Sequence, residues 1–186
     1  MEHQKILQDL KNISSKHSSL LIGIDGFGGS GKSTVANYLK SNLKNSVVIE
    51  MDDFYSPELK RADYLRVLRQ VIKSITKNQS FVYQIYDWKR DKLIDSKKIE
   101  VGSTVIVEGV FALEKSIRDF FDYTIWVDCD PIQAMERGIA RNLSEDGVDT
   151  REKWEKLWYP MELKYVTEQK PDVFANYIVR QNKGLN

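Results

Sequence analysis

The segment from Gly26 to Ser33 constrains this chain more than any other, because it satisfies the pattern G-x-x-x-x-G-K-[ST] at every fixed position. A short apolar run at residues 20 to 24 precedes it, and helix-forming residues at 33 to 43 follow it. Glycines let the backbone fold closely round phosphate groups, so that N–H groups and the positive end of the next helix point at the anion. The sequence therefore predicts a strand, a phosphate-binding loop and a helix. The alternative, a glycine-rich turn that happens to precede a lysine, is disfavoured by this context.

The individual positions of the loop have expected tasks. We expect Lys32 to be an exposed, mobile cation for the outer phosphates of a nucleoside triphosphate. We expect the hydroxyl of Ser33 to ligate Mg²⁺, which prefers oxygen ligands. The residues expected to contact the nucleotide are Gly26, Gly28, Gly29, Ser30, Gly31, Lys32, Ser33 and Thr34.

Composition narrows the class of protein. A chain of 186 residues fits a single domain, and 28 Lys and Arg against 27 Asp and Glu leave no broad basic field for nucleic acid or an anionic membrane. Cys129 is the single cysteine, so the chain cannot form an intramolecular disulfide or a thiolate metal cluster. No apolar run approaches the length of a membrane span, and the N-terminus lacks the apolar core of a signal peptide. We therefore expect a cytoplasmic protein.

Hydrophobic periodicity predicts strands alternating with helices. Besides residues 20 to 24, the expected strands lie at 47 to 51, 81 to 86, 104 to 107, 123 to 127 and 177 to 179. Besides residues 33 to 43, the expected helices lie at 3 to 14, 57 to 77, 113 to 121, from Pro131 onward and around 154 to 165, with a polar loop at 143 to 150. This order predicts an α/β fold: a parallel β-sheet flanked by helices, of the P-loop nucleoside triphosphate hydrolase type. We expect one domain over residues 1 to 186, with a lid at residues 131 to 150.

Carboxylates follow two of these strands. Ligands of parallel sheets bind beyond the carboxyl ends of the strands, so the loop, Asp52 and Glu108 are expected in one crevice. Phosphoryl transfer to an alcohol needs a carboxylate that orients and deprotonates the hydroxyl, and Asp52 is our candidate. Its neighbour Asp53 is the better candidate for a helix cap. Glu108 is a candidate outer-sphere Mg²⁺ ligand, or else a solvated carboxylate at the sheet edge.

Further candidates lie on the lid and in a loop. Arg137 and Arg141 are four residues apart, so they project from one helical face and can close over phosphates. Salt bridges from these arginines to Glu136 or Glu145 are the alternative. The residues that could form a planar, hydrogen-bonding acceptor pocket are Tyr55, Tyr86, Asp87 and Trp88, although aromatic side chains at strand ends are more often part of a core.

From residue 20 to about residue 180, the chain resembles the uridine kinase, phosphoribulokinase and nicotinamide riboside kinase family of P-loop kinases. Beyond the loop, the landmarks are Asp52-Asp53-Phe54-Tyr55, Tyr86-Asp87-Trp88, Val107-Glu108-Gly109, Val127-Asp128-Cys129-Asp130 and the segment from Trp158 to Tyr165. The resemblance implies that the first aspartate is the base, that the aromatic segment borders the acceptor and that the Glu-Gly pair supports the metal.

The same resemblance implies transfer of the γ-phosphoryl of ATP, with Mg²⁺, to an alcohol such as the 5′ hydroxyl of a nucleoside or riboside. The H-P-D-A-x-D segment of uridine kinases has no counterpart between residues 56 and 80, and residues 143 to 149 are acidic where uridine kinases carry arginines. The acceptor therefore stays open. The alternatives are a kinase for another small alcohol such as pantothenate, or a nucleotide-dependent switch with a protein partner.

Overall fold

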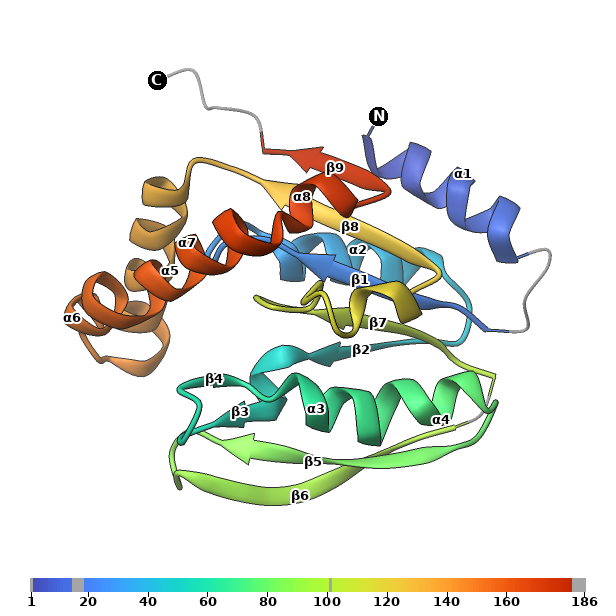
Figure 1. Cartoon of the computed structure of the whole chain (residues 1–186), viewed down its shortest axis with the longest axis horizontal. Helices are drawn as coiled ribbons and strands as arrows, with labels where there is room; N and C mark the ends of the chain where they lie inside the picture. The colour runs from blue at the N-terminus through green and yellow to red at the C-terminus, as the bar shows by residue number, and fades with distance from the viewer. Residues whose placement is uncertain (1, 15–18, 101, 182–186) are drawn as a thin grey trace.

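The computed structural model describes residues 2–14, 19–100 and 102–181. At its centre lies a five-stranded sheet in the order β2-β7-β1-β8-β9, in which all neighbouring strands are parallel (Figure 1). The strands are β1 (Leu21–Asp25), β2 (Ser46–Glu50), β7 (Thr104–Glu108), β8 (Tyr123–Asp128) and β9 (Tyr177–Arg180). The predicted fold class, a parallel sheet flanked by helices, is confirmed.

The register of the sheet brings the strand ends that carry polar residues to one edge. Ile24 of β1 pairs with Glu108 at the end of β7, and Glu50 at the end of β2 pairs with the same Glu108. On the other side, Asp25 of β1 pairs with Trp126 of β8. The segments that follow β1, β2 and β7 therefore all begin at the same edge of the sheet.

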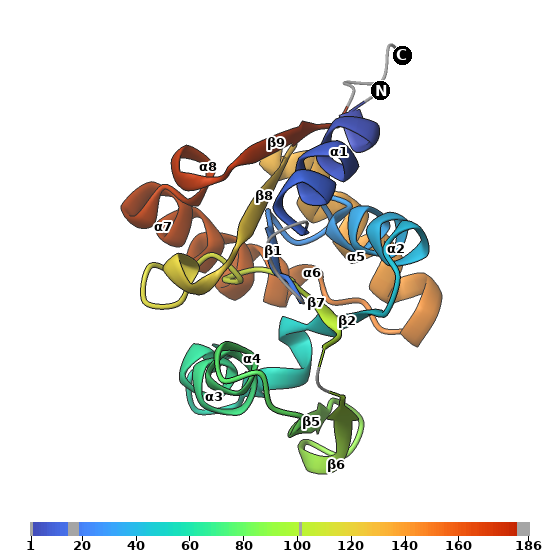
Figure 2. The same ribbon diagram turned by 90° about the vertical axis from the view of Figure 1, so that its right-hand side faces the viewer.

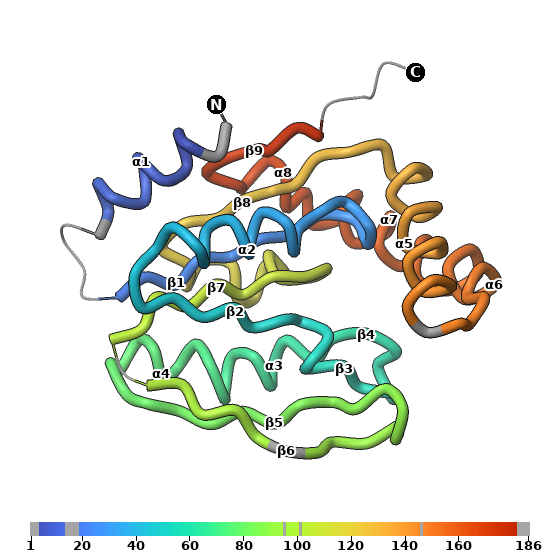
Figure 3. The backbone as a smooth tube through the Cα atoms, turned by 180° about the vertical axis from the view of Figure 1, so that it is seen from behind, coloured from blue at the N-terminus to red at the C-terminus, as the bar shows by residue number. Residues whose placement is uncertain are grey.

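Helices α1 (Glu2–Ser14) and α2 (Lys32–Asn42) cover one face of the sheet, as the view from behind shows (Figure 3). Ile6 and Leu10 of α1 share a buried core with Val35 and Leu39 of α2. The strand residues that complete this core are Ile22, Ile24, Ile106, Ile125, Val127 and Val179. Burial of apolar side chains at helical spacing thus fixes both helices on the sheet.

The chain between β2 and β7 packs against part of the other face and forms a separate layer beyond the β2 edge of the sheet (Figure 2). Its elements are η1 (Met51–Phe54), β3 (Tyr55–Ser56), β4 (Arg61–Ala62), α3 (Tyr64–Val67), η2 (Leu68–Ile72), α4 (Lys73–Thr76), β5 (Phe81–Asp87) and β6 (Lys92–Ile99). Phe54, Val67 and Tyr83 of this layer share a core with Val105 and Val107 of β7.

The prediction of a helix from residue 57 to 77 is wrong in its first part. Residues 55 to 62 contain the short antiparallel pair β3 and β4, and helical structure begins only at Tyr64. Asp63 explains this boundary, because its side chain accepts hydrogen bonds from the backbone N–H groups of Leu65 and Arg66. Leu59 seemed to belong to the apolar stripe, but it is 46% exposed.

Two short segments also differ from the sequence prediction. The expected helix at 113 to 121 is a series of turns that ends in the 3-10 turn η3 (Arg118–Phe120). The expected loop at 143 to 150 is shorter, because α5 (Pro131–Asp146) continues to Asp146 and ends at Gly147, whose φ of 68° suits a helix end. Pro131 at the start of α5 and the capping carboxylate of Asp130 mark its other end.

The chain after the lid forms a helical arm that returns to the sheet. It consists of α6 (Arg151–Lys153), η4 (Trp154–Trp158), α7 (Tyr159–Gln169) and α8 (Pro171–Phe174), after which β9 completes the sheet. Figure 1 shows α5, α6 and α7 gathered beyond the edge at which the strands end. No helix among the described residues is both long enough and apolar enough to cross a membrane.

Candidate active site

The phosphate-binding loop, residues Gly26 to Ser33, connects β1 to α2 as the sequence predicts. The loop folds on itself through a hydrogen bond from the Ser30 N–H to the Phe27 carbonyl at 2.9 Å. Gly29 has a φ of 82° and lies so close to the backbone of Ala134 that a Cβ would overlap it. Within the described residues, the buried hydroxyl of Ser30 has no hydrogen-bond partner. The loop therefore presents polar groups beside the first turn of α2, where an anion is favoured.

Lys32 differs from the expectation of an exposed cation. It is buried, and its ammonium donates a hydrogen bond to the Phe27 carbonyl at 2.8 Å, across the loop. The side chain thus folds back over the loop that it belongs to. Its charge still acts on the carboxylates of the site, since Lys32 lowers the pKa of Asp52 and of Glu108 against the larger effect of burial.

Ser33 and Glu108 lie together, although they are far apart in the sequence. The Ser33 hydroxyl donates a hydrogen bond to Glu108 Oε1 at 2.7 Å. Glu108 is buried at the end of β7, and this burial raises the pKa of its carboxyl. Because the hydroxyl proton is engaged with Glu108, the lone pairs of the Ser33 oxygen are free for a cation. This oxygen set fits Mg²⁺, which combines few protein ligands with phosphate oxygens and water. No group of three or more metal-ligating side chains occurs in the described residues.

Asp52 and Asp53 lie in η1, directly after β2, and have different surroundings. Asp52 is exposed to solvent at the mouth of the site, yet protein encloses it closely enough that desolvation raises its pKa. Lys32 and Arg141 act in the opposite direction. We expected Asp53 to cap a helix, but its carboxylate instead accepts hydrogen bonds from the Tyr83 hydroxyl at 3.0 Å and from Lys97 at 3.4 Å. Asp53 therefore ties η1 to the β5–β6 hairpin, while the carboxyl of Asp52 lies within the electrostatic range of Lys32 and Arg141.

The two lid arginines of α5 have separate roles. Arg137 donates a hydrogen bond from Nε to the Gly29 carbonyl at 3.0 Å, so it contacts the phosphate-binding loop directly. Glu136, the alternative partner, pairs with Arg151 at 2.7 Å and 2.8 Å. Arg141 is exposed one turn further along, and its charge lowers the pKa of both Asp52 and Glu108. The structure therefore brings Arg141 into the electrostatic range of both carboxylates.

The aromatic residues gather at the end of the β5–β6 hairpin. The ring centroids of Tyr55 and Trp88 lie 4.2 Å apart, and Tyr86 lies 5.0 Å from Tyr55 and 5.2 Å from Trp88. Trp88 is 50% exposed, so the cluster presents an aromatic face to solvent. Asp87 supports the turn that follows it: its Oδ1 accepts hydrogen bonds from the backbone N–H groups of Lys89 and Arg90, and its other oxygen pairs with Arg90 at 3.8 Å.

Sequence reasoning missed two buried carboxylates next to the loop. Asp25 accepts hydrogen bonds from the N–H groups of Gly26 and Leu113 and from the Tyr165 hydroxyl, and burial raises its pKa to about 6. Glu162 accepts a hydrogen bond from the Gly28 N–H at 2.9 Å, and burial raises its pKa to about 7. Asp25 stands at a strand end before the loop, which could have marked it. No sequence pattern around Glu162 indicates its role, because its partner Gly28 is far away in the sequence.

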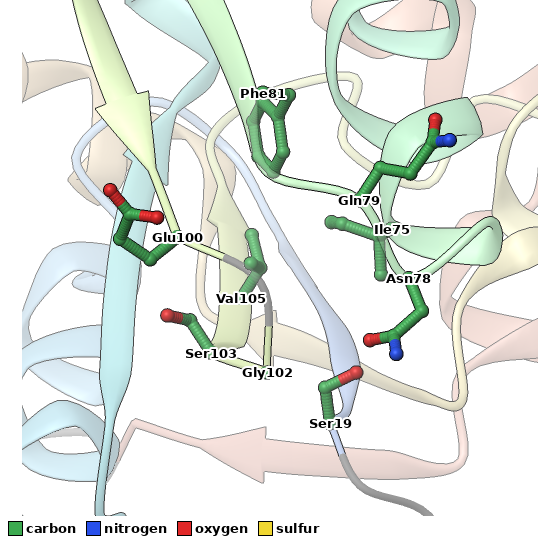
Figure 4. A pocket seen from close by; sticks show the side chains of 9 residues that line it. All are labelled: Ser19, Ile75, Asn78, Gln79, Phe81, Glu100, Gly102, Ser103 and Val105. Atoms are coloured by element: carbon green, nitrogen blue, oxygen red, sulfur yellow. The ribbon is translucent and has the colours of Figure 1, made fainter.

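A hollow on the molecule lies away from this site. Its lining includes Ser19 before β1, Ser103 before β7 and Phe81 at the start of β5 (Figure 4). Ser19 and Ser103 are at the amino ends of parallel strands, opposite the edge that carries the loop, Asp52 and Glu108. The hollow is therefore not part of the candidate site.

The sheet order, the loop between β1 and α2, and the Ser33–Glu108 pair define a P-loop protein that binds nucleoside triphosphates. In agreement, residues 22–157 match the family described as "AAA domain". A uridine kinase of Staphylococcus aureus is 31% identical over 151 residues, which cover 70% of this chain and 72% of that protein. The chain therefore belongs to the uridine kinase-like family of P-loop kinases, whose members are ATP-dependent phosphotransferases.

Other comparisons agree with the fold. A uridine kinase of Saccharomyces cerevisiae is 27% identical over 170 residues, but this alignment spans only 34% of the yeast protein and 78% of this chain. The structure of a possible uridine kinase from Bacillus stearothermophilus matches with a TM-score of 0.68 at 23% identity, over 96% of this chain and all of that one (100%). A D-glycerate 3-kinase from Cryptococcus neoformans matches with a TM-score of 0.66 at 15% identity, over 91% of this chain and 87% of that one.

Proposed function

We propose that the protein transfers the γ-phosphoryl group of ATP to a hydroxyl of a small molecule, and that the acceptor is the 5′ hydroxyl of a nucleoside or riboside. The observation that carries the proposal is the position of Asp52. This carboxylate follows β2 at the edge where the phosphate-binding loop opens, and both Lys32 and Arg141 act on its pKa. A base next to the cations that hold the transferred group is what phosphoryl transfer to an alcohol needs.

In the proposed reaction, Asp52 orients the acceptor hydroxyl and takes its proton as the hydroxyl oxygen bonds to the γ-phosphorus. The bond from that phosphorus to the bridging oxygen breaks, and ADP leaves with the electron pair. The loop N–H groups and Lys32 hold the phosphates, and Arg141 approaches them when the lid closes. Ser33 and Glu108 would hold Mg²⁺, which when bound neutralises phosphate charge.

The identity of the acceptor rests on the family relationship and on the aromatic face of Tyr55, Tyr86 and Trp88, on which a planar base could stack. A kinase for another small alcohol, such as pantothenate, uses the same catalytic residues and differs only at this face. A nucleotide-dependent switch has no need of a second carboxylate such as Asp52. We also propose that the protein works in the cytoplasm, where ATP and Mg²⁺ are available.

The test is a panel of nucleosides, ribosides and other small alcohols incubated with ATP and Mg²⁺, with the phosphorylated product identified by mass spectrometry. On the best acceptor, Asp52→Asn should lower the rate by about 10² to 10⁴, the usual worth of a general base, with ATP affinity nearly unchanged. Asp53→Asn is the matched control and should do much less, because Asp53 is bonded to Tyr83 and Lys97. Slow hydrolysis of ATP with no product from any acceptor would support the switch instead.

A further inference from the structure

Two side chains of the helix α7 support the phosphate-binding loop, Glu162 by direct contact and Tyr165 through Asp25. Glu162, one of them, is only 6% exposed, and its Oε2 accepts the hydrogen bond from the Gly28 N–H. Tyr165, on the same face, donates its hydroxyl to Asp25 at 2.6 Å, and Asp25 in turn accepts the N–H of Gly26 at 2.6 Å. The first half of the loop is therefore held from outside by a helix that lies far from it in the sequence.

The helical arm packs closely against Gly28. A Cβ at Gly28 would overlap the ring of Trp154 in η4 and would lie 3.0 Å from Glu162 Oε1. The same tryptophan ring fills the space beside Gly138 of the lid helix α5. Gly28 is thus enclosed by Trp154 and Glu162, so the helical arm determines where this N–H group stands.

The charges round Glu162 belong to the site itself. Lys32 lowers the pKa of Glu162, whereas Asp25 and Asp52 raise it, in addition to the larger effect of burial. Glu162 therefore stands beside the cation that would hold the phosphates. A nucleotide brings further negative charge to this place, which favours the protonated carboxyl of Glu162. A protonated carboxyl can still accept the Gly28 N–H through its carbonyl oxygen.

We propose that Glu162 is a positioning residue for the nucleotide: its carboxyl group fixes Gly28 and so holds the phosphate-binding loop in its binding shape before the nucleotide arrives. The proposal rests on the proposed function, since it assumes that the loop binds ATP. Preorganisation of this kind increases affinity, because the loop does not have to be ordered during binding. The acceptor plays no part in it, so binding alone can test it.

The experiment measures the dissociation constant of MgATP by calorimetry, without an acceptor, for the wild type and for three variants. Glu162→Ala removes the acceptor oxygen and should weaken binding roughly tenfold, the usual cost of leaving a buried N–H group without its partner. Glu162→Gln keeps an oxygen for the Gly28 N–H and should bind within about threefold of the wild type at pH 7. Glu168→Ala, an exposed position on the same helix, is the control and should change nothing.

Unchanged or tighter binding by Glu162→Ala would overturn the proposal, and so would Glu162→Gln binding as weakly as Glu162→Ala. If the wild-type protein does not bind MgATP at all, the proposed function fails. If the wild type binds MgATP and Glu162→Ala binds it equally well, only the role of Glu162 fails. Thermal unfolding of each variant shows whether it is folded.

A second measurement keeps the proposal testable if Glu162→Ala does not fold. As pH rises through about 7, the wild-type carboxyl of Glu162 loses its proton and places a negative charge beside the phosphates. Affinity for MgATP should then fall in the wild type relative to Glu162→Gln, which cannot ionise and serves as the baseline for the titration of ATP itself. Identical pH profiles of the two proteins would show that Glu162 does not act on the nucleotide.

Discussion

The hydroxyl of Ser33 donates a hydrogen bond to the carboxylate of Glu108 at 2.7 Å, joining the first turn of α2 to the end of β7. The bond orients the hydroxyl so that its lone pairs point away from Glu108. Although α2 and β7 are far apart in the sequence, the oxygens of Ser33 and Glu108 therefore lie together beside the phosphate-binding loop.

Glu108→Gln should raise the concentration of Mg²⁺ needed for half-maximal activity roughly 10- to 100-fold, the usual cost of losing an outer partner of a metal ligand. The amide can still accept the Ser33 hydroxyl, so the lost quantity is charge. Glu50→Gln is the matched control, because Glu50 pairs with Glu108 across β2 and β7 but does not bond to Ser33. If the two variants raised the required Mg²⁺ concentration equally, the effect would come from the net charge of this sheet edge and not from the contact between Glu108 and Ser33.

Lys32→Met should lower the rate of phosphoryl transfer by roughly 10² to 10³, since it removes the charge that stabilises the transferring group. Methionine is the better probe than alanine, because the lysine stem is buried and methionine fills most of the same space. Steady-state turnover is measured beside a thermal unfolding curve. A folded variant that turned over near the wild-type rate would remove Lys32 from the mechanism.

Arg141→Ala should lower kcat roughly 10- to 100-fold with a smaller change in the KM for ATP, because an exposed lid arginine contacts the phosphates most strongly in the closed state. Arg69→Ala, at an exposed position on the other side of the sheet, controls for the loss of a positive charge. Steady-state kinetics with a saturated acceptor separate kcat from KM. An unchanged kcat would leave Arg141 as a solvated surface residue.

The pH profile follows from the environment of Asp52, whose pKa is raised by desolvation and lowered by Lys32 and Arg141. A general base works only when ionised, so kcat/KM should fall as pH decreases, beginning at a higher pH than an ordinary aspartate would give. Arg141→Ala removes one lowering charge, and its acid limb should therefore move to still higher pH. An acid limb that Arg141→Ala leaves in place would assign the titration to another group.

Tyr165→Phe should lower the free energy of unfolding by about 1.5 to 3 kcal/mol, as expected for a hydrogen bond to a charged acceptor. Burial raises the pKa of Asp25 from 3.8 to about 6, so the folded state binds more protons than the unfolded state between these values. The stability contributed by Asp25 is thus present below pH 3.8 and is lost as pH rises through 6. The tyrosine hydroxyl favours the ionised form of Asp25. The loss of unfolding free energy in Tyr165→Phe should therefore be larger above pH 6 than below it.

Urea unfolding at pH 5 and pH 8, with Tyr159→Phe on the same helix as the control, measures this difference. Tyr159 is half-buried and has no recorded bond to Asp25 among the described residues. Equal deficits at the two pH values would mean that the hydroxyl does not distinguish the two forms of Asp25.

The sequence alone predicted the parts of the protein that depend on local pattern. The strands of the central sheet, α2 and the loop between them follow from apolar runs and fixed glycines, and the parallel order then brought Ser33 to Glu108. It misplaced the start of the helix after β4, because Asp63 was not recognised as a cap. It also missed β6, whose sequence Lys-Leu-Ile-Asp-Ser-Lys-Lys-Ile lacks the regular alternation of apolar and polar residues by which a strand is recognised.

Within the site, the errors arise from tertiary contacts. Lys32 is a loop residue by sequence, but its hydrogen bond to Phe27 buries it. Glu162 has no local signal at all, since its partner Gly28 precedes it by most of the chain. The place of Asp87 in the acceptor pocket stays a prediction, and the bonds from its Oδ1 to the N–H groups of Lys89 and Arg90 are a further contact that the sequence pattern does not indicate. Such roles are set by packing between distant segments, which periodicity does not report.

In the sheet, β2 and β7 are direct neighbours, yet residues 51 to 103 separate them along the chain. That excursion carries Asp52 and the aromatic face, and its described strands, β3 to β6, pair only with one another and not with the five central strands. It is attached to the sheet by an apolar underside that includes Phe54, Val67 and Tyr83. A lineage could exchange one such unit for another and acquire a new acceptor, while the machinery that handles ATP stayed as it was.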